Sequence, residues 1–150
     1  MQTQNVTIRA YEPATDTEKL SGIWLDASLR AHGFIGEDRL LQQRALIETE
    51  YLPNAQTWVA CLNEEPVGFI SLIDTFVGGI FVAPDRQGHG IGRRLIAKAI
   101  GEKRTLSLEV YTANHQAMQF YTVLGFEEVS RRPIDDEGQP FENALLRLSD

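Results

Sequence analysis

The chain has 150 residues, of which 43% are hydrophobic and 23% are charged; these proportions are typical of an ordinary globular domain and exclude intrinsic disorder. We therefore expect a single domain over residues 1–150. The 14 Lys and Arg residues against 21 Asp and Glu residues give a formal net charge of −7, which argues against the broad basic face that nucleic acid binding requires.

No run of apolar residues reaches the length of a membrane span, and the first residues lack the pattern of a secretory signal. We therefore expect a cytoplasmic protein without a membrane partner. The single cysteine, Cys61, lies in the apolar run TWVACL and cannot form a disulfide within the chain. No Cys/His cluster has the spacing of a zinc site, so we expect no metal and a buried structural thiol.

The first half of the chain predicts one strand, two helices and then three strands. The expected elements are a strand over residues 6–11, a helix opened by Thr15 and Glu18 at capping-box spacing, a helix from about Glu37 to Leu52 that Pro53 and Asn54 end, and strands over residues 57–62, 66–73 and 76–82. Leu40, Ile47 and Tyr51 fall on one face of the second helix.

The second half predicts two more helices and three strands, which add to one mixed sheet. The expected elements are a helix that starts in a glycine-rich loop and runs to about Glu102, a strand over residues 106–111, a helix opened by Asn114 and ended by Gly125, and strands over about 126–132 and 142–148.

The glycine-rich loop, Gln87-Gly88-His89-Gly90-Ile91-Gly92, lies between an expected strand and an expected helix. Glycines let backbone N–H groups approach a ligand closely. The start of a helix offers unsatisfied N–H donors and a partial positive charge. Arg93 and Arg94 follow directly and add two cationic side chains. The loop therefore predicts an anion site suited to a pyrophosphate.

Two other phosphate-binding motifs fit this loop less well. A P-loop ends in Gly-Lys-Ser/Thr, which is missing here. A Rossmann loop would use Gly88 and Gly90, with Glu109 as the acid on a strand about 20 residues further on. However, Arg93 stands where the third glycine belongs, and residues 83–87 separate the strand from the first glycine. A dinucleotide site is therefore the weaker alternative.

Two stretches match motifs of one enzyme superfamily. The first is Val82-Ala83-Pro84-Asp85-Arg86-Gln87-Gly88-His89-Gly90-Ile91-Gly92, and the second is Asn114-x-x-Ala117-x-x-Phe120-Tyr121-x-x-x-Gly125-Phe126. On these residues the chain resembles the GCN5-related N-acetyltransferase (GNAT) superfamily. More narrowly, Ile23-Trp24, His32-x-Phe34-Ile35 and Asp135-Asp136-x-Gly138-x-Pro140 resemble the small bacterial acetyltransferases of the YjaB type.

The resemblance implies an α/β (α+β) fold with a single mixed, mostly antiparallel sheet of about six to seven strands and about four helices packed on it. The sheet is expected to splay between its fourth strand, Phe76–Val82, and its fifth strand, over residues 106–111. Acetyl-CoA, the co-substrate of the family, would lie in this opening. Gly78-Gly79 would mark the place where the fourth strand bulges away.

The resemblance also implies which residues contact acetyl-CoA. Main-chain groups of the fourth strand would pair with the pantetheine arm, the glycine-rich loop would hold the pyrophosphate, and the later helix would contact the coenzyme from its start. In chain order these residues are Ile80, Phe81, Val82, Gln87, Gly88, His89, Gly90, Ile91, Gly92, Arg93, Asn114, Ala117 and Phe120. Because Asn is among the best helix N-caps, Asn114 is expected to fill both roles.

Tyr121 is, by the same resemblance, the general acid of a direct transfer from thioester to amine. A tyrosine pKa near 10 and a thiol pKa near 8.5 make full proton transfer uphill by about 2 kcal/mol. Tyr121 is therefore expected to act as much by hydrogen-bonding the developing thiolate as by protonating it. A backbone N–H of the fourth strand would polarise the thioester carbonyl.

The acceptor side of the reaction is less defined. Only about one lysine amine in a few thousand is neutral at pH 7, so a base or a water chain must take a proton. Glu109 and His32 are the candidate base and acceptor-side residues, with Asp74 as a third. A protein lysine, an N-terminal amine, a polyamine, an aminoglycoside and another small amine are all open as acceptors, and the YjaB-type features favour a protein lysine.

Two further questions stay open at this point. The protein is expected to work as a monomer or a homodimer. The alternative from another functional class is a non-catalytic acyl-CoA-binding sensor, against which the presence of Tyr121 and Asn114 argues.

Overall fold

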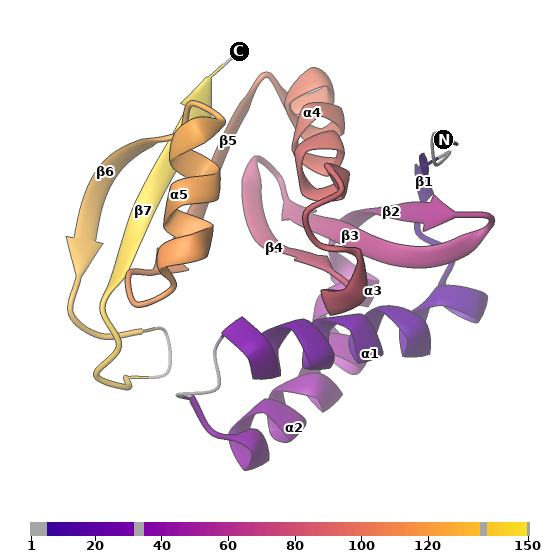
Figure 1. The fold of residues 1–150 in the computed structure, drawn as a ribbon. Coiled ribbons are helices and arrows are strands. Elements are labelled where there is room, and N and C mark those ends of the chain that lie inside the picture. Colours follow the sequence, from indigo (N-terminus) through magenta and orange to yellow (C-terminus); the bar gives the residue numbers. More distant parts are fainter. Residues whose placement is uncertain (1–5, 32–34, 136–137, 150) are drawn as a thin grey trace.

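A computed structural model describes residues 6–31, 35–135 and 138–149 of the chain. Seven strands form one sheet in the order β1-β2-β3-β4-β5-β7-β6 (Figure 1). The strands are β1 (Val6–Ala10), β2 (Gln56–Leu62), β3 (Glu65–Ile73), β4 (Phe76–Val82), β5 (Thr105–Tyr111), β6 (Glu127–Arg132) and β7 (Asn143–Ser149). The helical elements are α1 (Pro13–Ala31), α2 (Glu37–Leu46), η2 (Ile47–Tyr51), α3 (Leu52–Asn54), η3 (Pro84–Arg86), α4 (Ile91–Lys103) and α5 (His115–Val123). None of the described helices is long and apolar enough to cross a membrane.

Strand pairing is antiparallel throughout the described sheet except between β4 and β5, which run parallel. The hairpin between β2 and β3 turns on Asn63 and Glu64, which have φ values of 53° and 70°, as a tight two-residue turn requires. The expected mixed, mostly antiparallel sheet is confirmed. Every strand boundary lies within one residue of its expected position.

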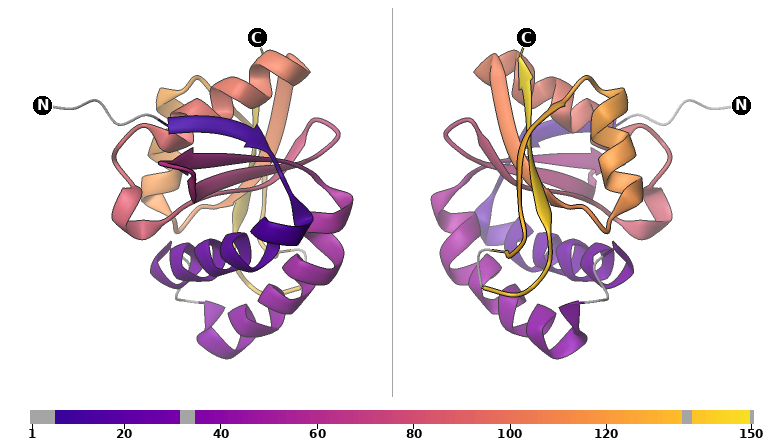
Figure 2. Two further views of the ribbon diagram at one scale, coloured as in Figure 1. Left: turned by 90° about the vertical axis from the view of Figure 1, so that its right-hand side faces the viewer. Right: turned by 90° about the vertical axis from the view of Figure 1, so that its left-hand side faces the viewer.

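Two hydrophobic cores lie on the two faces of the sheet. Along β2, Trp58, Ala60 and Leu62 join the core under α4 and α5, whereas Val59 and Cys61 join the core under α1 and α2. This alternation follows from the period of two along a strand. Figure 2 shows α4 on one side of the sheet and α1 and α2 on the other. Since both faces are covered, β2 is apolar almost without interruption, and Cys61 is the buried thiol that the sequence predicts.

The start of α1 differs from the expectation. The helix begins at Pro13, ahead of the expected capping pair Thr15 and Glu18. The carboxylate of Asp16 accepts a hydrogen bond from the Glu12 backbone N–H at 2.8 Å. Asp16 therefore satisfies a backbone donor at the start of the helix, and Pro13 has no N–H that needs a partner.

The second expected helix, from Glu37 to Leu52, is interrupted. It is regular only to Leu46, and a π-helical turn, η2, follows before the short helix α3. The helical path ends at Asn54, as expected for the Pro53-Asn54 pair, with Pro53 inside the short helix α3. The π-helical turn is an irregularity of a kind that is common at functional sites.

Candidate active site

The strands β4 and β5 pair over a very short stretch and then separate. Only two parallel pairs join them among the described residues, Phe76 with Ser107 and Val77 with Leu108. Beyond these pairs, β4 continues beside β3 alone as far as Val82. The edge of β4 that faces β5 therefore carries backbone groups without a strand partner. The expected splay between the fourth and fifth strands is confirmed.

A bulge in β4 lies at the point of separation. Along β3, Ser71 is opposite Gly79, and the next residue, Leu72, is opposite Val77. Gly78 is therefore an extra residue in β4, as expected for the Gly78-Gly79 pair. A bulge bends the strand that carries it and turns its backbone groups away from the regular ladder.

The loop before α4 exposes backbone donors. Gly88 and Gly90 have φ values of 83° and 81°, and a Cβ added at either would meet no atom within 4 Å. No described residue accepts a hydrogen bond from the backbone N–H groups of residues 91–93. The Gln87 side chain donates to the Val82 carbonyl at 3.1 Å and ties the loop to the end of β4. This combination of open space, N–H donors and helix dipole fits an anion.

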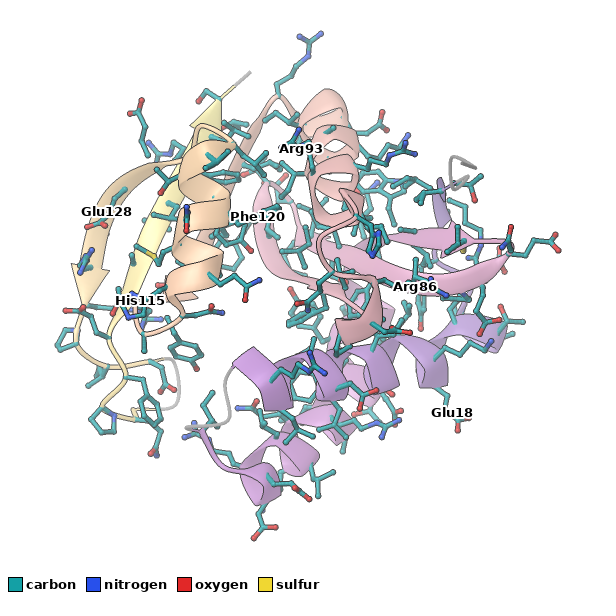
Figure 3. The ribbon with its side chains drawn as sticks, in the orientation of Figure 1. Glu18, Arg86, Arg93, His115, Phe120 and Glu128 are labelled. Carbon is teal, nitrogen blue, oxygen red and sulfur yellow. The ribbon has the colours of Figure 1, made fainter. Side chains whose placement is uncertain are left out.

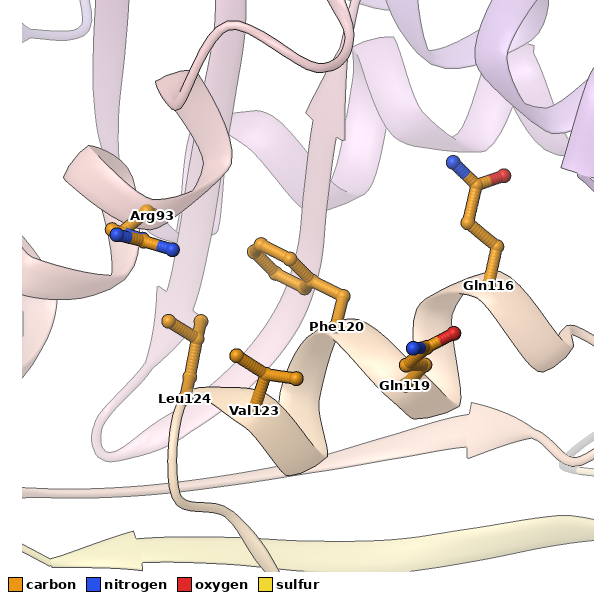
Figure 4. Close-up of a pocket in the computed structure, with 6 residues that line it drawn as sticks. All are labelled: Arg93, Gln116, Gln119, Phe120, Val123 and Leu124. Atoms are coloured by element: carbon orange, nitrogen blue, oxygen red, sulfur yellow. The ribbon is translucent and has the colours of Figure 1, made fainter.

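A pocket of about 260 Å³ lies between α4 and α5. It is lined by Arg93, Gln116, Gln119, Phe120, Val123 and Leu124 (Figure 4). The Phe120 ring turns from α5 toward Arg93, and Figure 3 places both residues in the whole molecule. A Cβ at Gly92 would lie only 3.1 Å from that ring, so glycine at this position lets the two helices approach. A cation beside an apolar wall suits a ligand with both anionic and apolar parts.

Asn114 caps helix α5. Its side-chain oxygen, Oδ1, accepts a hydrogen bond from the Ala117 backbone N–H at 3.1 Å. The expected N-cap role is confirmed, since one of the unsatisfied donors at the helix start now has a partner. The expected contact of Asn114 and Ala117 with the coenzyme stays a prediction.

Tyr121 lies in the core on the α5 side of the sheet. Its ring packs edge-on against Phe120 and Phe126, with centroid distances of 5.2 and 5.3 Å. Burial raises the pKa of Tyr121 far above its ordinary value. The phenol therefore stays protonated near neutral pH and can donate a hydrogen bond. The raised pKa also makes full proton transfer to a thiolate more unfavourable than for an exposed tyrosine.

The comparisons with known proteins agree with this geometry. The model of the acetyltransferase (GNAT) domain matches residues 53–128. The peptidyl-lysine N-acetyltransferase YjaB of Salmonella typhimurium is 35% identical over 132 residues, which cover 87% of this chain and 89% of the relative. The chain belongs to the GNAT family. The apo form of YjaB from Escherichia coli has the same fold, with a TM-score of 0.85 and 30% identity over 95% of this chain and 97% of that one.

As a GNAT member, the protein is an N-acetyltransferase whose co-substrate is acetyl-CoA. A structure of yncA from Salmonella typhimurium with its cofactor acetyl-CoA shares the fold, with a TM-score of 0.69 and 22% identity over 96% of this chain and 93% of that one. The dinucleotide alternative is wrong, because a Rossmann sheet is parallel and this GNAT sheet has one parallel pair among its described strands.

The candidate bases of the GNAT reaction differ in how they are placed. Both carboxylate oxygens of Glu109, on β5, accept hydrogen bonds from Arg132 at 2.9 Å. Asp74 is exposed in the turn between β3 and β4, with a φ of 55°. His32 lies outside the described residues. Glu109 would have to take a proton at an oxygen that Arg132 now occupies.

Tyr111, Arg39 and Asp135 come together from distant segments, and of the three only Asp135 lies in a motif that the sequence analysis singles out. The Tyr111 hydroxyl, at the end of β5, donates to Oδ2 of Asp135 at 3.2 Å. The Arg39 guanidinium, on α2, lies 3.7 Å from the same oxygen. These contacts join β5, α2 and the segment between β6 and β7 around a carboxylate that is only 5% exposed. No local pattern could have found this group, since its members come from three distant segments.

Proposed function

We propose that the protein transfers the acetyl group of acetyl-CoA directly to the ε-amino group of a lysine in another protein. The observation that carries this proposal is the 35% identity with the peptidyl-lysine N-acetyltransferase YjaB over 87% of the chain. The net charge of −7 also suits a cationic acceptor, because opposite charges raise the rate of encounter.

We further propose that the coenzyme is bound mainly through backbone groups. The unpaired edge of β4 supports a pairing of Ile80, Phe81 and Val82 with the pantetheine arm. The open N–H donors at the start of α4 support pyrophosphate binding. The residues assigned to that binding are Gln87, Gly88, His89, Gly90, Ile91, Gly92 and Arg93, and those that contact the coenzyme from α5 are Asn114, Ala117 and Phe120. The pocket between α4 and α5 lies next to both groups.

The chemistry follows from these positions. The neutral amine attacks the thioester carbon, so that a C–N bond forms while negative charge moves to the carbonyl oxygen. A backbone N–H of β4 stabilises this oxyanion. The C–S bond then breaks, and the Tyr121 hydroxyl donates a hydrogen bond to the leaving thiolate. The proton that the amine loses passes to Glu109, to His32 or through water to solvent.

The cellular setting and the oligomeric state are also part of the proposal. The described helices include no membrane span, and a lysine acetyltransferase needs contact with other proteins in the same compartment. We assign the protein to the cytoplasm, as one acetyltransferase domain over residues 1–150 that works as a monomer or a homodimer.

The test is acetyl-CoA turnover over a panel of amines, with the products identified by mass spectrometry. The panel contains a lysine peptide with a blocked N-terminus, a lysine-free peptide with a free N-terminus, a polyamine and an aminoglycoside. We expect acetylation of the lysine peptide. Preferential acetylation of another amine would overturn the lysine assignment. No acetylation of any amine in the panel would favour the non-catalytic sensor.

A further inference from the structure

Tyr51 reaches from the α2 side of the sheet to the point where β4 leaves β5. It is the last residue of the π-helical turn η2. Its side chain fills the space that a side chain at Gly78 would need: a Cβ added there would overlap the Tyr51 hydroxyl and would lie 3.0 Å from ring atom Cε2. Because Gly78 is the bulged residue of β4, the Tyr51 hydroxyl lies at the opening itself.

The Tyr51 hydroxyl is buried and makes no hydrogen bond to any described residue. A buried hydroxyl without a partner destabilises the folded state, and a phenylalanine would fill the same space without that loss. Burial also raises the pKa of Tyr51 to about 12, so the group is neutral at physiological pH and keeps both a donor and an acceptor. A hydrogen-bond partner for the hydroxyl that a bound substrate supplies would explain why position 51 holds tyrosine and not phenylalanine.

The turn that carries Tyr51 is held in place from α1. The Ser21 hydroxyl donates to the Glu48 carboxylate within η2. The Arg44 side chain donates from Nε to the same Ser21 oxygen at 3.1 Å. Ser21 is fully buried, whereas Arg44 and Glu48 are each about one-third exposed. Tyr51 is therefore presented by a fixed segment, as a group that orients a substrate must be.

The position of Tyr51 relative to the two faces decides which substrate it meets. The anion-binding loop, α4 and α5 all lie on one face, where the coenzyme enters. Tyr51 comes from the opposite face, where α1 and α2 pack. A substrate that reaches the thioester from that face is the acceptor amine. A phenol oxygen accepts a hydrogen bond from an amine, and the ring attracts its cationic form.

We propose that the Tyr51 hydroxyl accepts a hydrogen bond from the nitrogen of the acceptor amine and so positions it for attack on the acetyl group. The proposal rests on the proposed function, in that the acceptor is a primary amine. It adds an acceptor-binding residue that the motifs of the sequence do not mark.

The test is Tyr51→Phe, with Tyr11→Phe as the matched control. Tyr11→Phe removes the same atom, but the Tyr11 hydroxyl hydrogen-bonds to Thr17 near the start of α1. For Tyr51→Phe we expect the KM for the amine to rise by about tenfold, the loss of one good hydrogen bond. The Kd for acetyl-CoA should not change, and the melting temperature should not fall. Tyr11→Phe should keep wild-type KM values.

Three outcomes would overturn the proposal. An unchanged KM for the amine would show that the hydroxyl does not touch it. A lower kcat with unchanged KM would place the hydroxyl on the thioester instead. A lower melting temperature with no kinetic change would make it structural. The assay uses whichever amine the wild-type protein acetylates, so a failed lysine assignment and a failed role for Tyr51 give different results.

Discussion

In the site that we propose, the two faces of the strand opening bind their substrates by different means. On the coenzyme face, the loop before α4 and the free edge of β4 offer backbone N–H groups, and glycines such as Gly88 and Gly90 leave them open. On the proposed acceptor face, the polar group is the side chain of Tyr51 from η2, which tertiary packing brings to Gly78 of β4. One face depends on local backbone geometry, and the other depends on how distant segments pack.

This difference indicates which substrate specificity can change through substitutions, that for the coenzyme or that for the acceptor. A backbone cradle tolerates few substitutions, because every side chain added to it intrudes on the ligand. A wall of side chains can change one residue at a time while the fold stays intact. We therefore expect the coenzyme to be common to relatives with this fold and the acceptor to vary among them.

The largest effect is expected for Tyr121→Phe, which tests the chemistry between the two faces. The phenylalanine ring keeps the packing against Phe120 and Phe126. The lost hydroxyl matters mainly when charge develops on sulfur, so kcat should fall by about 10²–10⁴-fold. Single-turnover transfer at saturating acetyl-CoA measures this, with binding and melting followed on the same samples. Transfer at the wild-type rate would remove Tyr121 from the mechanism.

Gly90→Glu should break the coenzyme face. The variant places a carboxylate in the anion site, at a position whose φ of 81° already favours glycine. We expect affinity for acetyl-CoA to fall by about 100-fold or more, because like charges then face each other. Isothermal calorimetry gives the affinity. Gly101→Glu, at an exposed position on the same helix with open space around it, is the control and should bind like the wild type.

Gly78→Ala should damage the acceptor face. The added methyl group would overlap the Tyr51 hydroxyl, so the tyrosine must move. We expect the KM for the amine to rise by about tenfold and the free energy of unfolding to fall by about 1–3 kcal/mol. Steady-state kinetics and urea unfolding measure the two effects. If the amine KM does not change, Tyr51 is not part of the acceptor site.

The smallest effect is expected for Asn114→Ala. Its side chain caps α5 through Ala117, so the substitution should lower the free energy of unfolding by about 0.5–2 kcal/mol. Asn114→Asp is the matched variant, because aspartate caps equally well but adds a negative charge. If Asn114 only caps the helix, Asn114→Ala will have a lower melting temperature than Asn114→Asp in thermal denaturation. The affinity for acetyl-CoA will then be the same in both variants. Weaker coenzyme binding by both would support the second role.

The sequence predicts the backbone features of the proposed coenzyme face, because those features are built locally. The glycine loop, the bulge at Gly78 and the cap at Asn114 all lie within short motifs, and each has a backbone reason that the residue type reveals. The positions of the strands along the chain also follow from turn signals, whereas the place of β7 between β5 and β6 in the sheet does not.

The acceptor face could not be predicted in the same way. Helical spacing places Tyr51 on an apolar face, but a regular helix to Leu52 does not foresee the π-helical turn. The contact with Gly78 joins segments that the chain separates by two strands. Tyr111, Asp135 and Arg39 meet for the same reason: tertiary packing, rather than any local pattern, brings them together.

We propose that the coenzyme occupies one face of the opening and leaves the other face free for the acceptor. Amide hydrogen exchange with and without saturating acetyl-CoA tests it most directly. We expect slower exchange in residues 88–93 and 79–82, whose N–H groups would bind the coenzyme, and unchanged exchange in Ile47–Tyr51. Protection of Ile47–Tyr51 without protection of residues 88–93 would contradict the account.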